Sequence, residues 1–193
     1  MSVSPLGATF ARGRDATFLE DGDGAWTPSR LLALAREVAS AVPPSSGGTV
    51  GVRARSASFI AASLLGVWSV RRQALLLDPE LQDEPQGLPE GGAFPVVAPG
   101  HEPKARPSDL VVREGRGEPL DPVLPEDGDG LVAFLTSGST GAPKIVAKRG
   151  YQLARQFEVE LGCLGLEGPI TVLSLVPAFH ILGFVYGIYD AAA

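Results

Sequence analysis

The sequence predicts an α/β fold: a mostly parallel sheet, built from βαβ units and covered by helices. Strand-like runs at 49–54 and 73–78 enclose a helical run at 56–70, which is the order of a βαβ unit. The run ALLL at 74–77 does not alternate, as expected of a parallel strand that is buried on both faces. Of the 193 residues, 45% are hydrophobic, which is enough for the core of one domain.

The first helix is expected at 28–42, because Thr27 can cap it and Pro28 suits its first position. Residues at helical spacing should form its buried face: Leu31, Leu34, Ala35, Val38 and Val42. Proline, glycine and acids dominate 79–130, which predicts loops with one or two edge or peripheral strands, for which 94–98 and 109–114 are the candidates. The two DGDG strings predict turns and not calcium loops, since the later acidic ligands are missing, and no metal-ligating residue is predicted.

Further along, a strand at 131–136 should lead into a polar loop, followed by a short return strand at 145–148. A helix is predicted at 151–165 and another strand at 170–175. The inner face of this helix should carry Leu153, Phe157, Leu161 and Leu164. We expect Cys163 to pack near that face and to perform no chemistry.

Composition excludes several classes of partner. The net charge is −6 and the pI about 4.9, so no basic surface invites nucleic acid or anionic lipid. A single cysteine excludes an intramolecular disulfide and suits a reducing compartment. The uncharged run 170–189 is long enough for a membrane span, but Pro177 and His180 interrupt it and no Lys or Arg flanks it. We therefore expect a cytoplasmic protein without a membrane span.

The loop after 131–136 has the composition of a phosphate site. In the stretch FLTSGSTGAPK, Gly138 and Gly141 let successive N–H groups point into one concavity, and four hydroxyl side chains surround them. Lys144 adds a positive charge, so the stretch suits a polyphosphate. The P-loop pattern does not fit, because Ala142 and Pro143 separate the second glycine from the lysine and no helix is expected there. A polar surface turn that binds nothing is the alternative.

The order of these residues resembles a known family. The stretch 136–144 matches the pattern [ST]-S-G-[ST]-T-G-x-P-K of the adenylate-forming (ANL) superfamily without a gap. The helix-bearing stretch 26–42, the pair Asp78–Pro79 and the stretch LVPAFHILGF at 175–184 are similar to other segments of these enzymes, in the same order. The resemblance implies that residues 1–193 are the N-terminal portion of the AMP-binding domain, with the C-terminal domain absent.

The resemblance also implies an activity. Such a ligase uses ATP and Mg²⁺ to convert a carboxylic acid to an acyl-adenylate, and passes the acyl group to the thiol of coenzyme A or of an acyl carrier protein. His180 and Gly183 would belong to the wall of the acyl pocket. Lys144 is the expected catalytic residue, and the β- and γ-phosphates would be bound by Thr136, Ser137, Gly138, Ser139, Thr140, Gly141 and Lys144.

One departure and one rival function remain. From Lys144 onwards the chain runs KIVAKRGYQL, whereas many members have glycine and a Thr-His pair after the lysine. This departure favours a divergent acyl- or aryl-activating branch. A portion of the domain is expected to be inactive alone. The rival is a non-catalytic nucleotide- or acyl-binding module that acts with a partner.

Overall fold

The structure is a computed structural model that describes residues 15–43, 48–80, 96–98, 111–113, 131–136, 144–165 and 171–189. Its helices are α2 (Pro28–Ala41), α3 (Ala57–Ser69), α4 (Gly150–Leu164), α5 (Ile181–Phe184) and the π-helical turn η2 (Val185–Tyr189). Its strands are β1 (Leu19–Asp21), β2 (Gly24–Trp26), β3 (Thr49–Arg53), β4 (Gln73–Leu77), β5 (Val96–Ala98), β6 (Val111–Arg113), β7 (Leu131–Thr136) and β8 (Lys144–Arg149).

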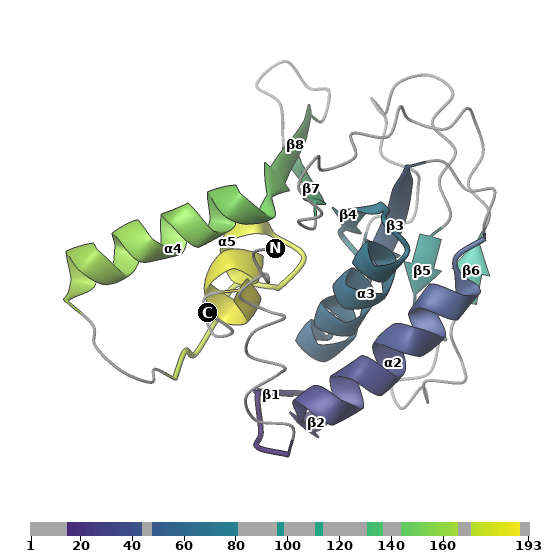
Figure 1. Ribbon diagram of the computed structural model, residues 1–193, viewed down its shortest axis with the longest axis horizontal. Coiled ribbons are helices and arrows are strands. Elements are labelled where there is room, and N and C mark those ends of the chain that lie inside the picture. Colours follow the sequence, from purple (N-terminus) through teal and green to yellow (C-terminus); the bar gives the residue numbers. More distant parts are fainter. Residues whose placement is uncertain are drawn as a thin grey trace.

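Among the described residues, the main sheet has six strands in the order β6-β5-β3-β4-β7-β8. The four inner strands are parallel, and the two edge strands, β6 and β8, each run antiparallel to their neighbour. The predicted βαβ unit is β3-α3-β4, in which α3 packs on both strands it connects (Figure 1). The mostly parallel α/β fold is therefore confirmed, and the strands expected at 94–98 and 109–114 lie at one side of the sheet.

Local sequence signals place the two long N-terminal helices correctly. Thr27 caps α2, its hydroxyl oxygen accepting the N–H of Arg30 at 3.3 Å, and the five predicted inner residues of this helix are all buried. Ser56 caps α3 by accepting the N–H of Phe59 at 3.2 Å. The two helices lie side by side in Figure 1, where α3 packs against the sheet and α2 against α3.

Both faces of β4 are buried, as its uninterrupted apolar run predicts. Ala74 and Leu76 join the large core beneath α3. Leu75 and Leu77 point to the opposite face, where they form a smaller cluster with Ala133 of β7. None of these side chains is more than 2% exposed, so the strand has no solvent-facing side that would require polar residues.

The prediction of a strand at 170–175 is wrong. Residues 171–175 belong to no strand, and Leu173 and Leu175 are 85% and 88% exposed. A strand needs a neighbour that completes its hydrogen bonds, and none of the described strands runs alongside this segment. After it, residues 181–189 form the short α5 and η2. None of the described helices is long and apolar enough to cross a membrane.

The predicted helix at 151–165 is confirmed as α4, but its predicted packing face is only partly right. Leu153 is buried, while Phe157 is half-buried and Leu164 is exposed. Cys163 is also exposed, so our expectation that it packs against apolar neighbours is wrong. The reason is visible in Figure 1, where the first turns of α4 lie near β8 and α5 and the rest extends away from the sheet. The side chain of Leu161 lies outside the described residues.

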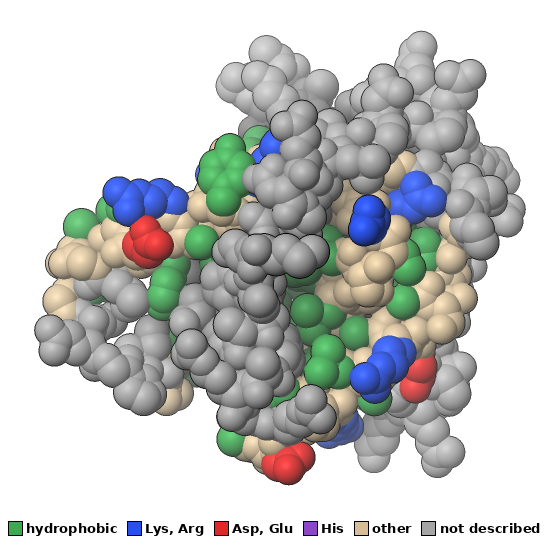
Figure 2. All heavy atoms as spheres, viewed as in Figure 1, with side chains coloured by type: hydrophobic (Ala, Val, Ile, Leu, Met, Phe, Trp, Pro, Cys, Tyr) green, Lys and Arg blue, Asp and Glu red, His purple; other side chains and the backbone are tan. Residues whose placement is uncertain are grey.

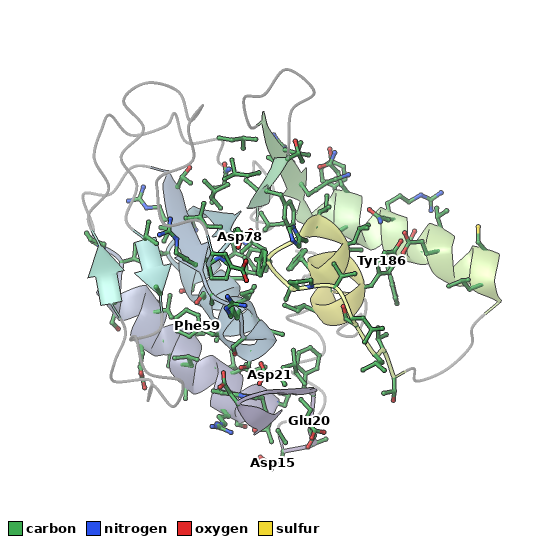
Figure 3. All side chains as sticks on the ribbon, turned by 180° about the vertical axis from the view of Figure 1, so that it is seen from behind. Asp15, Glu20, Asp21, Phe59, Asp78 and Tyr186 are labelled. Carbon is green, nitrogen blue, oxygen red and sulfur yellow. The ribbon has the colours of Figure 1, made fainter. Side chains whose placement is uncertain are left out.

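One carboxylate attaches the β1-β2 hairpin to the start of α3. Oδ2 of Asp21 accepts the hydroxyl of Ser56 at 3.0 Å and the backbone N–H of Ser58 at 2.8 Å. Its Oδ1 accepts the N–H of Asp23 at 2.9 Å, which shapes the hairpin turn. Figure 3 shows Asp21 near this end of α3. A negative charge at the N-terminus of a helix satisfies free N–H groups and interacts favourably with the helix dipole.

The hydrogen bonds of Asp21 predict a stability effect. Asp21→Ala should lower the free energy of unfolding by about 1–3 kcal/mol, because it removes a partly buried acceptor of three hydrogen bonds. Urea denaturation followed by far-UV circular dichroism would measure this. Glu20→Ala, at the exposed preceding position, is the matched control and should change stability by less than about 0.5 kcal/mol. Equal stability of the two variants would contradict the role of Asp21.

Gly66 allows α2 and α3 to approach closely, and this predicts a second effect. A Cβ at Gly66 would lie 2.5 Å from the carbonyl oxygen of Ala35 and 2.9 Å from Cβ of Val38. Gly66→Ala should therefore destabilise the chain by about 1–3 kcal/mol through overpacking. Gly162→Ala, in α4, meets nothing within 4 Å and should be neutral or stabilising by up to about 1 kcal/mol. Thermal unfolding of both variants would show whether the signs differ.

Candidate functional site

The candidate site begins at the carboxyl edge of the parallel strands. Because β3, β4 and β7 are parallel, the residues that follow them lie along the same edge of the sheet. These are Arg55 near the end of β3, Asp78 directly after β4, and Thr136, the last residue of β7. Ligands of open α/β sheets bind outside the carboxyl ends of the strands. The edge that carries Thr136 is therefore the one where a ligand is expected.

The glycine- and hydroxyl-rich stretch is the connection of a β-hairpin. Strands β7 and β8 pair antiparallel from Leu131↔Arg149 to Thr136↔Lys144, so residues 137–143 join the two ends. Of the predicted phosphate-binding residues, the structure places Thr136 and Lys144 opposite each other at the end of the ladder. Ser137, Gly138, Ser139, Thr140 and Gly141 lie outside the described residues, as does the side chain of Lys144.

An aromatic cluster fixes the strand that enters this hairpin. The ring of Phe134 in β7 lies 5.6 Å from that of Phe184 in α5, which in turn lies 6.3 Å from the ring of Tyr189. All three are at most 2% exposed, and the hydroxyl of Tyr189 donates to the carbonyl oxygen of Gly150 at 3.2 Å. Tilted aromatic pairs at these separations stabilise beyond their buried area. The cluster therefore joins β7 to the segment that carries His180 and Gly183.

The two predicted acyl-pocket residues differ in their surroundings. His180 is exposed, lies beside Phe179 with ring centroids 4.6 Å apart, and makes no side-chain hydrogen bond that caps α5. Gly183 is buried, and a Cβ there would overlap the carbonyl oxygens of Val176 and Pro177. Gly183 thus permits a close backbone approach, whereas the imidazole of His180 is available to a ligand. Their assignment to an acyl pocket remains a prediction.

Two charged residues at this edge, Arg55 and Glu80, were not predicted from the sequence. Arg55 and Glu80 form an ion pair at 2.8 Å, and Oδ1 of Asp78 accepts the N–H of Glu80 at 2.9 Å. Their position within three residues after the ends of two parallel strands was the signal that could have identified them. Both partners of the ion pair are about two-thirds exposed (70% and 66%), so the pair contributes little to stability. Within the described ranges, no three His, Cys, Asp or Glu residues gather as a metal site requires.

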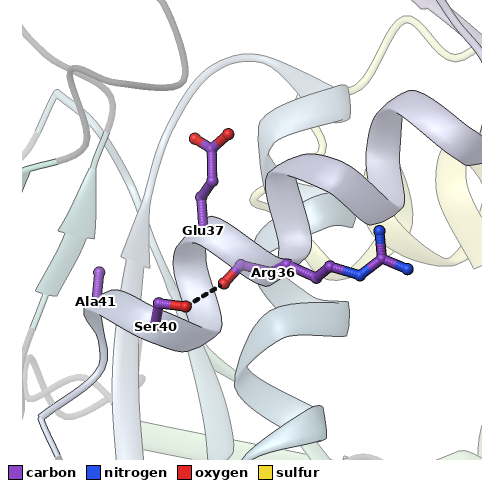
Figure 4. A pocket seen from close by; sticks show the side chains of 4 residues that line it. All are labelled: Arg36, Glu37, Ser40 and Ala41. Carbon is purple, nitrogen blue, oxygen red and sulfur yellow. Dashed lines mark hydrogen bonds between the residues drawn. The ribbon is translucent and has the colours of Figure 1, made fainter.

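A depression on another surface of the described residues does not form a competing site. A shallow depression on the outer face of α2 is lined by Arg36, Glu37, Ser40 and Ala41 (Figure 4). These residues come from one helix, and the Ser40 hydroxyl already donates to the Arg36 carbonyl oxygen at 2.9 Å. A single helix cannot enclose a ligand. On the face drawn in Figure 2, the described Lys, Arg, Asp and Glu side chains are scattered and form no patch of one sign.

Comparison with known proteins gives a fold but no close relative. No protein-family model matches the chain, and no curated protein matches it by sequence. Solved structures do match: o-succinylbenzoate CoA synthetase (MenE) from Bacillus subtilis, bound to its product analogue OSB-NCoA, has a TM-score of 0.69 at 17% identity. VinN in complex with 3-methylaspartate has a TM-score of 0.62 at 19% identity. Apo MatB from Rhodopseudomonas palustris has a TM-score of 0.66 at 15% identity.

The chain has the fold of the adenylate-forming enzymes. The alignments cover 99%, 97% and 100% of this chain but only 42%, 58% and 44% of the MenE, VinN and MatB chains. MenE is also matched in complex with the acyl-adenylate intermediate OSB-AMP, with a TM-score of 0.64. The chain thus spans about half the length of the adenylate-forming enzymes it matches.

Because His180 is exposed and Gly183 is buried, substitutions at the two positions should change the free energy of unfolding by different amounts. His180→Ala should change the free energy of unfolding by less than about 0.5 kcal/mol, because the imidazole is exposed. Gly183→Ala should destabilise by about 1–3 kcal/mol, because the new methyl group would displace the backbone at 176–177. Thermal unfolding of both variants is the measurement. A large loss of stability in His180→Ala would show that the imidazole has a structural role.

Proposed function

We propose that the chain is the N-terminal part of an AMP-forming acid–thiol ligase. The observation that carries this proposal is the position of the stretch 136–144. Its order of residues resembles the phosphate-binding signature of the adenylate-forming enzymes, and its two ends close a hairpin at the carboxyl edge of a sheet with their fold. Sequence order and three-dimensional placement thus support the same site.

The proposed reaction matches the chemistry of this stretch. A carboxylate oxygen of the acid forms a bond to the α-phosphorus of ATP, and the bond from that phosphorus to the bridging oxygen of the β-phosphate breaks. The acid is already ionised at neutral pH, so this step needs no general base. The barrier comes from bringing an anion to a polyanion and from the charge that develops on the departing pyrophosphate. Amide and hydroxyl hydrogens, together with a lysine, lower that barrier.

Within the proposal, Lys144 is the catalytic residue, and the stretch from Thr136 to Gly141 binds the β- and γ-phosphates. The pairing of Thr136 with Lys144 holds the two ends of the stretch in register and so limits where the ammonium group can reach. Mg²⁺, when bound with ATP, would neutralise phosphate charge. No described residue is assigned to it, because the described side chains provide no cluster of acidic ligands.

The proposed acyl acceptor is inferred from the structurally similar enzymes and not from residues that the structure describes. MenE is matched in complexes with OSB-AMP and OSB-NCoA, which correspond to an acyl-adenylate and a coenzyme A product analogue. By analogy, the ligase would pass its acyl group to the thiol of coenzyme A or of a carrier protein in the cytoplasm. His180, exposed beside the aromatic cluster of β7 and α5, would contribute to the acyl pocket together with the buried turn at Gly183.

A second function is favoured by the partial coverage of the neighbours. Since the chain spans 42% to 58% of the MenE and VinN chains, it could act as a nucleotide- or acyl-binding module whose partner supplies the remaining part. Both functions require nucleotide binding by the same hairpin. They differ in whether ATP–pyrophosphate exchange depends on the carboxylic acid in the assembled protein.

Replacing Lys144 tests the phosphate assignment directly. Lys144→Ala should weaken the binding of ATP with magnesium by about tenfold to a hundredfold, because a charge-assisted hydrogen bond contributes about 1.5–3 kcal/mol. Isothermal titration of the chain with ATP is the measurement. The matched control is Lys148→Ala, in the same strand and opposite Val132, which should bind as the unmodified chain does. Equal affinities of the Lys144→Ala variant and the unmodified chain would remove the assignment.

A further inference from the structure

The ends of β3 and β4 lie where the order of the strands reverses. From β3 the chain moves to β4 on one side, and its next described strand, β5, pairs on the other side of β3. Ligands of open α/β sheets bind at such a reversal, outside the carboxyl ends of the strands. Arg55 follows β3 there, and Asp78 and Glu80 follow β4. Charged side chains at these three positions therefore lie where a ligand is expected.

Asp78 lies level with Thr136 on the same face of the sheet. Leu76 pairs with Phe134, and both side chains belong to the core beneath α3. Two residues further along each strand, the alternation of side chains returns Asp78 and Thr136 to this face. Neighbouring strands are about 4.8 Å apart. One carboxylate is therefore only one strand away from the described end of the proposed phosphate site.

A turn after β4 brings a second carboxylate to Arg55. Oδ1 of Asp78 accepts the backbone N–H of Glu80 at 2.9 Å, which is the hydrogen bond of an Asx turn. Oε1 of Glu80 in turn accepts Nη2 of Arg55 at 2.8 Å, although the two residues are 25 positions apart. The guanidinium of Arg55 is therefore held at the end of β4, from which both carboxylates originate.

The three side chains together carry one net negative charge. The carboxylates of Asp78 and Glu80 oppose a phosphate group, and Arg55 offsets one of them. Arg53, the last residue of β3, lies on the opposite face of the sheet by strand alternation. The Debye length at 0.1 M salt is about 10 Å, or about two strand spacings, so exposed charges at this distance still act on a ligand. Loss of the guanidinium would leave two carboxylates unopposed within this range of Thr136.

We propose that Arg55 determines how strongly this edge binds polyphosphate. Its guanidinium offsets the carboxylates after β4, so that a triphosphate approaches Thr136 against less negative charge. The ion pair with Glu80 adds little to stability, because its partners are 70% and 66% exposed, and its role is in the electrostatics of binding. This role rests on the proposed function, from which the triphosphate is taken. The alternative is a surface ion pair without a role in binding.

The chain offers a matched control, the ion pair of Arg155 and Glu158 in α4. Its N–O distance is also 2.8 Å, and its partners are 75% and 63% exposed. Helix α4 begins after Arg149, which pairs with Leu131 at the opposite edge of the sheet. Arg155→Ala therefore removes the same charge from an equally exposed pair away from the carboxyl edge. A difference between Arg55→Ala and Arg155→Ala reports the position of the charge and not the net charge.

Isothermal titration with ATP and magnesium at two salt concentrations tests the proposal. At about 50 mM salt, Arg55→Ala should bind ATP about threefold to tenfold more weakly than the unmodified chain, and Arg155→Ala should bind as the unmodified chain does. Arg55→Lys keeps the charge and should stay within about twofold of the unmodified chain. At about 500 mM salt the loss in Arg55→Ala should fall below about twofold, because salt screens exposed charges. A loss that persists at high salt, or no loss at low salt, would overturn the proposal.

Removing the carboxylate of Glu80 separates an electrostatic role from a structural one. Glu80→Gln should bind ATP about threefold to tenfold more tightly than the unmodified chain at low salt, since Arg55 is then no longer paired. If the ion pair instead shaped the edge, Arg55→Ala and Glu80→Gln would both bind more weakly. Equal or weaker binding by Glu80→Gln therefore contradicts the role of Arg55.

The outcomes also separate this role from the proposed function. If Lys144→Ala weakens ATP binding and Arg55→Ala does not, the phosphate site stands and the role of Arg55 fails. If Arg55→Ala weakens ATP binding in a salt-dependent way and Lys144→Ala does not, the role of Arg55 stands and the assignment of Lys144 fails. If the unmodified chain binds no ATP, the proposed function fails, and the role of Arg55 fails with it.

Discussion

The fold depends on the parallel pairing of β3, β4 and β7. Val50, Leu75 and Ala133 at the centre of these strands are fully buried, so their peptide groups find hydrogen-bond partners only on neighbouring strands. A parallel pair needs a crossover, and α3 provides the one between β3 and β4 while covering their apolar face. Because all three strands run in one direction, residues far apart in the sequence meet at one edge. Arg55 and Glu80 illustrate this, since they are separated by 25 positions and form an ion pair.

The reversal between β7 and β8 ends this parallel arrangement at one side of the described sheet, and the reversal between β5 and β6 ends it at the other. The chain returns from β3 to the start of β4 through α3, whereas after β7 it turns back and pairs antiparallel, as β6 does beside β5. The stretch with the phosphate-binding signature is therefore held at both ends by strands of the same sheet. The strand on its N-terminal side is further fixed by the contact of Phe134 with Phe184. A site built on such a support keeps its geometry better than one on an isolated surface loop.

The elements that were predictable from sequence are those whose signals are local. Thr27 is a helix cap and ALLL at 74–77 is a buried strand, as predicted, because a capping side chain and an uninterrupted apolar run each indicate a local hydrogen-bonding or burial requirement. The predictions that were wrong depend on which elements pack next to each other, which local sequence does not specify. Residues 171–175 have strand-like composition but no neighbouring strand among the described residues, and Leu164 has the right helical spacing but is exposed. Of the candidate site, the stretch 136–144 was named from the sequence and its role stays a prediction. The edge residues Arg55 and Glu80 were not named, because their meeting depends on strand order.

The hairpin also determines how phosphate charge would have to be balanced. In a P-loop, the strand leads into a helix whose free N–H groups and dipole attract the anion. Here Lys144 is the first residue of β8, so the stretch after β7 leads into a strand and not into a helix. Sheets carry only a small net dipole, and the positive potential must come from loop amides, hydroxyl hydrogens and a full charge. Lysine is scarce in the chain, at Lys104, Lys144 and Lys148, and of these only Lys144 adjoins the stretch. In this architecture the only full positive charge next to the stretch would come from Lys144, whereas in a P-loop the free N–H groups of a helix share that role.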